Sequence, residues 1–272
     1  MTKIEILDKL KSDVVNIPFE AENLSTNFNF TKNDVRYYFY GLFQNTINQY
    51  YLGWNILFFF EEVDSTEIYK LYNNQNLNEF KKNHIEKLFF IQDEKPKETY
   101  QRNLNRNLVL SSFSSFETCI NLIFDNLVNK EEFNNFLNVT TRIDEKSFLK
   151  NFDENQKTRI ISKLSINHSL YKKYRFLSKN KYDSMRKDDL DFIKFISDYR
   201  NSIIHNNGIF NTQGYEKEVF GVKFIFEKGK EVLIQKNENS FLINWKICLK
   251  MKEIFTRLIS NLKHSELIEF PD

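Results

Sequence analysis

The chain of 272 residues carries 39 basic and 37 acidic side chains, which gives a formal net charge of +2. This balance excludes a polycationic nucleic-acid coat but permits local basic patches. Six glycines and three prolines supply few turn signals, so the composition favours long helices over a β-sandwich or a barrel. We therefore expect a mostly α protein.

We expect neither export nor membrane insertion from this sequence. Its first fifteen residues, MTKIEILDKLKSDVV, carry charges throughout and do not resemble a signal peptide. The longest apolar run, LGWNILFFF, is much shorter than a membrane span. Cys119 and Cys248 lie in apolar helical patterns without metal-ligand spacing, which predicts buried free thiols in a reducing compartment. We expect a cytoplasmic protein with no membrane partner.

The N-terminal part of the chain predicts a helical region whose role the sequence leaves open. An amphipathic helix is expected at 2–16, followed by a polar, Asn-rich stretch at 18–33. Thr31 is a candidate N-cap for a long aromatic segment at 34–62. This segment favours a helix, with a strand as the alternative for its second half.

A polar segment, QDEKPKET at 92–99, separates this region from the rest of the chain. Shorter helices are expected before it, at 65–73 and 76–91. Pro96 marks the segment as a linker. We therefore predict two domains, 1–98 and 99–272.

The pattern beyond the linker predicts three helices, a β-hairpin and a closing helix. The helix that contains Arg200 ends at NNG, where Gly208 can adopt the left-handed conformation of a helix stop. Alternating residues around Lys228-Gly229 indicate the hairpin. The expected ranges are 100–128, 153–177 and 188–206 for the helices, 218–234 for the hairpin and 241–263 for the closing helix.

Arg200 and Glu117 each interrupt an apolar helical stripe. At about 100° per residue, four isoleucines lie within about 60° of Arg200: Ile193, Ile196, Ile203 and Ile204. A guanidinium on such a face is costly unless it meets a carboxylate, a phosphate or a water-filled cleft. Glu117 lies among aromatic and aliphatic residues on the first helix after the linker. We therefore predict a buried Glu117–Arg200 ion pair.

His205 follows Arg200 by five residues, which places it about 140° away around an ideal helix. Both residues converge on one target only if the last turn loosens or a second subunit contributes. Two interpretations stay open: a core arginine beside a helix-capping histidine, or an active site. Arg257 and His264 form a similar arginine-histidine pair with a longer spacing, and we interpret these two residues as solvated surface.

The stretch DYRNSIIHNNG, followed by a hairpin and a closing helix, resembles the HEPN (higher eukaryotes and prokaryotes nucleotide-binding) ribonucleases. The residues that carry the resemblance are Asp198, Arg200, Asn201 and His205, and it extends over roughly residues 100–264. It implies a HEPN-like helical bundle with a small β-hairpin before the last helix, here with a helical N-terminal extension. It also implies a homodimer in which two Arg-His motifs face one cleft.

By this resemblance the chain is expected to be an endoribonuclease acting as a toxin or antiviral defence effector. The catalytic candidates are Arg200, His205, Asn201 and Glu117. The RNA 2′-hydroxyl can act as nucleophile, a histidine can move the proton, and an arginine can stabilise the phosphorane-like transition state. We expect no metal and no cofactor, and 2′,3′-cyclic phosphate products. The alternative is a non-catalytic scaffold that binds a nucleotide or a protein, and an antitoxin or defence-system partner protein is a further candidate partner.

The segment SLYKKYRFLSKNKYDSMRKDD interleaves basic and aromatic residues. Basic charge can hold an RNA backbone while aromatic faces stack on bases. We select Lys172, Lys173 and Arg175 as candidate RNA-binding residues. A solvated helix face with buried aromatic rings is an alternative of equal weight.

Overall fold

The computed structural model describes residues 2–28, 30–62, 94–132, 170–182, 184–205, 209–210, 213–235 and 242–260, with isolated positions at 70, 73, 78, 79, 135 and 153. This part is mostly helical, with short antiparallel strands before the last helix, which confirms the predicted mostly α class. Its helices are α1 (Lys3–Phe28), α2 (Val35–Glu62), α5 (Glu94–Leu127), α9 (Leu170–Phe176), α10 (Lys187–His205) and α11 (Ile243–Ser260), and a π-helical turn, η1 (Leu177–Lys181), continues α9. No helix in these ranges combines the length and the apolar content needed to cross a bilayer.

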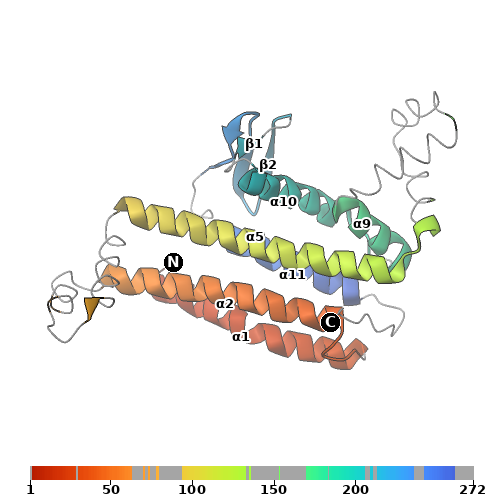
Figure 1. The fold of residues 1–272 in the computed structure, drawn as a ribbon, viewed down its shortest axis with the longest axis horizontal. Coiled ribbons are helices and arrows are strands. Elements are labelled where there is room, and N and C mark those ends of the chain that lie inside the picture. The colour runs from red at the N-terminus through yellow and green to blue at the C-terminus, as the bar shows by residue number, and fades with distance from the viewer. Residues whose placement is uncertain are drawn as a thin grey trace.

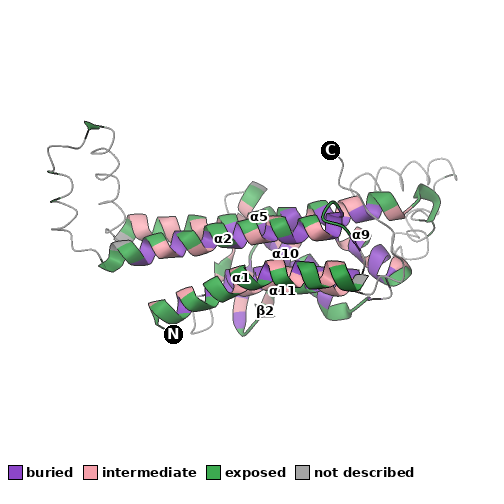
Figure 2. Ribbon diagram, turned by 90° about the horizontal axis from the view of Figure 1, so that it is seen from below, coloured by how far each residue is buried: buried purple, intermediate pink, exposed green. Residues whose placement is uncertain are grey.

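The long helix α5 lies at the centre of the bundle (Figure 1). It packs against α2, which packs in turn on α1, and it also contacts α9, α10 and α11. Aromatic rings fill the space between α2 and α11: Phe39 stacks on Phe255 with ring centroids 3.9 Å apart, and Tyr50 stacks on Trp245 at 5.5 Å. Buried residues accordingly line the facing sides of these helices (Figure 2).

Helix α1 is longer than the sequence predicts, because it continues through Pro18 to Phe28. Proline removes one backbone hydrogen bond from a helix interior. Ile17 and Ala21, on either side of Pro18, are buried in the core, and this burial favours a continuous helix. The predicted polar stretch at 18–33 is therefore mostly helix.

The aromatic segment forms the helix α2 throughout, which settles the helix-or-strand alternative. Asp34, and not Thr31, caps it, because Asp34 Oδ1 accepts the backbone N–H of Arg36 at 2.8 Å. The Arg36 guanidinium also donates to Asp34, and both side chains are fully buried.

The predicted linker is helical from Glu94 onward, and Pro96 lies in the first turn of α5. Proline is tolerated there because the first-turn N–H groups have no partner within the helix. The predicted domain division falls inside α5, whose contacts reach α2 on one side and α11 on the other. The helices predicted at 65–73 and 76–91 lie outside the described residues except for the isolated positions.

Two hairpins replace the single predicted one. β2 (Tyr215–Val219) pairs with β3 (Val222–Phe226) through a tight turn at Phe220 and Gly221, which have φ of 53° and 74°. β3 pairs in turn with β5 (Leu233–Ile234), after the predicted turn at Gly229. The first turn gave no signal because bulky residues such as Phe rarely adopt positive φ. The remaining two strands, β1 (Ile209–Phe210) and β4 (Lys230–Glu231), pair with each other.

The helices predicted at 100–128, 188–206 and 241–263 correspond to α5, α10 and α11. α5 begins six residues earlier than predicted, and the other ends differ from the prediction by one to three residues. Of the helix predicted at 153–177, the structure describes Asp153 and the residues from Leu170 onward, which form α9. Gly208, the predicted helix stop, lies outside the described residues.

Candidate functional site

The strands hold the C-terminal half of α10 in place. The Phe195 ring lies edge-on to Phe224 with centroids 5.0 Å apart, and Tyr199 contacts the same ring at 5.4 Å. The Tyr215 hydroxyl on β2 donates to Asp198 at 2.9 Å. Burial, and then the Asp198 charge, raise the pKa of Tyr215, so its hydroxyl stays protonated. Asp198, one of the motif residues, therefore ties α10 to the strands.

Arg200 reaches from α10 to α5. Its Nη2 lies 3.9 Å from Glu117 Oε2, and its guanidinium lies over the Phe113 ring at 5.3 Å from the centroid. Its Nη1 donates to Asn201 Oδ1 at 2.9 Å. The predicted contact between Glu117 and Arg200 is thus present.

The Glu117–Arg200 pair is not buried, contrary to the prediction. The exposed fractions of the two side chains are 34% and 23%. Ile193 and Ile196 of the predicted apolar stripe are buried, but Ile204 is 43% exposed. The last turn of α10 therefore extends beyond the core, and the pair lies at its margin.

The structure does not test the convergence of Arg200 and His205. His205 is the last residue of α10, but its side chain lies outside the described part of the chain. On a regular helix the two positions are about 7.5 Å apart along the axis and about 140° apart around it. Asn201 lies next to Arg200 on the exposed side of α10.

The basic segment has its aromatic rings in the core. Tyr174, Phe176 and Tyr182 are buried and Tyr171 is half-buried, which favours the alternative of a solvated face over base stacking. Among the candidate RNA-binding residues, Lys172 is exposed and Arg175 is half-buried. The Lys173 ammonium lies 5.2 Å from the centroid of the Phe124 ring, and its Nζ lies 3.9 Å from Asp125 Oδ1. Only their charges remain candidates for contacting RNA.

Arg257 forms a buried ion pair that sequence reasoning missed. Its Nη1 donates to both carboxylate oxygens of Asp189 at 2.9 Å, and the Asp189 side chain is 1% exposed. Arg257 itself is 16% exposed, so its interpretation as solvated surface was wrong. His264, the other residue of that looser spacing, lies outside the described residues. The missing signal was Asp189, which lies 68 residues away in the sequence.

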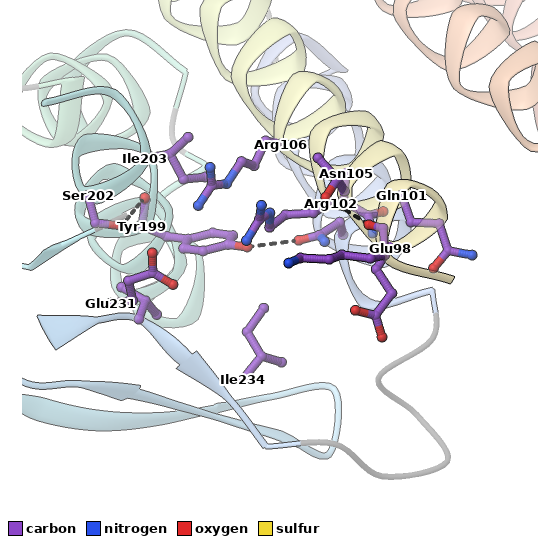
Figure 3. Close-up of a pocket in the computed structure, with 14 residues that line it drawn as sticks. Glu98, Gln101, Arg102, Asn105, Arg106, Tyr199, Ser202, Ile203, Glu231 and Ile234 are labelled. Atoms are coloured by element: carbon purple, nitrogen blue, oxygen red, sulfur yellow. Dashed lines mark hydrogen bonds between the residues drawn. The ribbon is translucent and has the colours of Figure 1, made fainter. Parts of the chain in front are cut away.

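Sequence reasoning also missed a polar cavity of about 570 Å³ between α5, the end of α10, the strands β4 and β5, and α11 (Figure 3). Arg102 and Arg106 line it from α5, while Tyr199 and Ser202 line it from α10. The polar run QRNLNRN at 101–107, which precedes the apolar part of α5, is the signal that could have indicated it.

Over the described ranges, no group of three His, Cys, Asp or Glu side chains could hold a metal ion. Comparison with known proteins finds no family model, no curated protein and no solved structure that matches the chain. The HEPN resemblance therefore depends on the residues quoted from the sequence.

Proposed function

We propose that the chain is a HEPN-type, metal-independent endoribonuclease that cuts RNA with Arg200 and His205 at the end of α10. The observation that carries this proposal is that the Arg200 side chain is anchored by other residues and still partly exposed to solvent. The guanidinium is held on one side by Glu117 and the Phe113 ring, and 23% of the side chain remains open to solvent. A guanidinium that is anchored but accessible can accept a phosphate on its free side.

The proposed reaction needs only groups that RNA and the chain supply. His205 takes the proton of the 2′-hydroxyl while the 2′-oxygen bonds to phosphorus. The bond from phosphorus to the 5′-oxygen breaks, and the departing oxygen takes the proton back from His205, which is then an imidazolium. The products are a 2′,3′-cyclic phosphate and a 5′-hydroxyl end. Arg200 stabilises the charge that builds up on the phosphate oxygens.

Glu117 and Asn201 act as positioning residues in this proposal. The Glu117 carboxylate and the side-chain amide oxygen of Asn201 hold two nitrogens of Arg200 at 3.9 and 2.9 Å. Fixing a long side chain in advance lowers the entropy cost of binding the transition state. Lys172, Lys173 and Arg175 supply positive charge for the RNA backbone. The biological role that we propose, a toxin or antiviral effector, is the one implied by the HEPN resemblance.

The test is cleavage of mixed RNA by the purified full-length chain in EDTA, with chemical identification of the new ends. We expect cyclic phosphate ends from the parental protein and no cleavage by His205→Ala or Arg200→Ala. Lys194→Ala is the matched control, because Lys194 is an exposed cation on the same helix. Parental cleavage by His205→Ala, or activity that requires added Mg²⁺, would overturn the proposal.

A non-catalytic scaffold is the second candidate, and one observation favours it. Glu117, Asn201 and Phe113 already engage Arg200, as they would in a purely structural role. This alternative predicts that the parental protein leaves RNA intact while Arg200→Ala still lowers stability. Expression in cells adds a second measurement, because the ribonuclease proposal expects growth arrest that depends on His205.

A further inference from the structure

The polar cavity beside α10 has the dimensions and lining of a binding site. Its volume of about 570 Å³ falls within the roughly 300–1,000 Å³ of small-molecule sites. Arg102 and Arg106, one helical turn apart on α5, extend toward Tyr199 and Ile203 on the opposite wall (Figure 3). Like charges four residues apart on a helix repel each other, and an anion bound near both relieves that repulsion.

The charge of the lining favours an anion. Three basic residues, Lys95, Arg102 and Arg106, outnumber the two acidic ones, Glu98 and Glu231. The positive charge of Arg106 also acts on the buried Tyr199 hydroxyl, where it opposes the rise in pKa that burial causes. Arg106 therefore brings its charge close to the Tyr199 end of the cavity.

The wall formed by α10 and α11 is polar and buried. The Tyr199 hydroxyl donates to Asn244 Oδ1 at 3.3 Å, so the amide nitrogen of Asn244 is the group that can donate to a ligand. The Ser202 hydroxyl donates to the Tyr199 carbonyl at 2.7 Å, which leaves its oxygen as an acceptor. Ile203 and Ile234 add apolar surface. Donors and acceptors beside apolar surface suit the edge and face of a nucleobase.

The cavity lies next to the proposed catalytic residues. Ile203 follows Arg200 by three residues, and Ser202 precedes His205 by three. Three residues correspond to about 300° of helix rotation, so each of these cavity residues lies about 60° from one catalytic position. The face of α10 that lines the cavity is thus flanked by Arg200 on one side and by the position of His205 on the other.

We propose that this cavity binds one nucleotide of the RNA strand next to the scissile phosphate, with that nucleotide's phosphate at Arg102 and Arg106 and its base between Ile203, Ile234 and Asn244. This assignment rests on the proposed ribonuclease function for its substrate. Arg102 and Asn244 then act as specificity-determining residues, since they contact a part of the RNA that does not react.

The test is binding of a labelled, single-stranded 2′-O-methyl RNA to the full-length chain, measured by fluorescence anisotropy. This RNA cannot be cut, because the methyl group blocks the nucleophile. We expect Arg102→Ala to weaken binding at least tenfold and Glu98→Gln to strengthen it, since the two changes alter the cavity charge in opposite directions. Lys194→Ala, which removes an exposed cation from α10 away from the cavity, should bind like the parental chain.

The outcomes separate this assignment from the catalytic one. Arg102-dependent binding without cleavage would support the cavity and count against catalysis by His205. Cleavage in which Arg102→Ala keeps the parental KM and base preference would overturn the cavity. If a nucleoside monophosphate competes with the same affinity as the RNA strand, the cavity is a site for a free nucleotide, and the proposal that it binds part of an RNA strand is overturned. Equal competition by inorganic phosphate would overturn any role for the base.

Discussion

Replacing Glu117 by glutamine removes one charge of the pair that holds Arg200 while keeping the shape of the side chain. Opposite unit charges 3.9 Å apart attract by about 1 kcal/mol in a water-like dielectric and by about 4 kcal/mol at an effective dielectric constant of 20. The exposed fractions of 34% and 23% place this pair near the first value, since exposed ion pairs contribute about 0.2–1 kcal/mol. We therefore expect Glu117→Gln to lower the free energy of unfolding by about 0.5–1 kcal/mol.

Urea unfolding measures the loss of stability in the Glu117→Gln chain, and RNA cleavage kinetics measure its loss of activity. Glu117→Gln should reduce kcat about tenfold with little change in KM, because the Arg200 side chain is then held less firmly in the position that stabilises the transition state. Asp191→Asn is the control, since Asp191 is an exposed acid on α10 and has no part in the proposed site. A loss of stability above about 3 kcal/mol, which is typical of breaking a buried pair, would refute the estimate. An unchanged kcat would refute the positioning role.

Two further predictions concern buried groups away from the site. Asp189→Asn leaves Arg257 without its buried carboxylate and should lower the free energy of unfolding by about 2–4 kcal/mol, measured in urea. Adding Arg257→Met to the same chain should restore part of that stability. A loss below about 0.5 kcal/mol would contradict this prediction. Burial raises the pKa of Cys119 and Cys248 to about 12, so only about one thiol in ten thousand is ionised at pH 8. A thiol reagent added to the native protein should therefore label these cysteines only as fast as the protein unfolds. Because unfolded thiols ionise near pH 9, stability should fall as pH rises from about 9 to 12, and rapid native labelling at pH 8 would contradict this burial.

The sequence predicts the long helices well because their apolar periodicity is strong and local. The same periodicity made Glu117 and Arg200 exceptional, and two charges that interrupt apolar stripes did meet across α5 and α10. Periodicity gave no measure of burial, because that depends on how far α10 extends past the core. The predicted pair was therefore correct in its partners and wrong in its environment.

Features that depend on distant segments left weaker signals in the sequence. The cavity combines residues of α5, α10, α11 and the strands, and only the run at 101–107 gave a local indication of it. Arg257 looked solvated because its partner Asp189 lies on another helix. The polar stretch at 18–33 indicated that the first helix ends near residue 16, whereas burial of Ile17 and Ala21 keeps α1 continuous. In each case tertiary packing outweighed a local preference.

The last prediction is that one active site needs two subunits. Arg200 and His205 are about 140° apart around α10, so a single straight helix does not aim both at one phosphate. Around a two-fold axis, two copies of α10 can place the arginine of one subunit beside the histidine of the other. Mixing equal amounts of Arg200→Ala and His205→Ala chains should then restore about a quarter of the parental activity, because about half of the dimers are heterodimers and each keeps one of its two pairs. Each variant alone should stay inactive, and dilution below the dimer dissociation constant should abolish parental cleavage. Full activity of the diluted monomer would show that the last turn of α10 brings the two residues together within one chain.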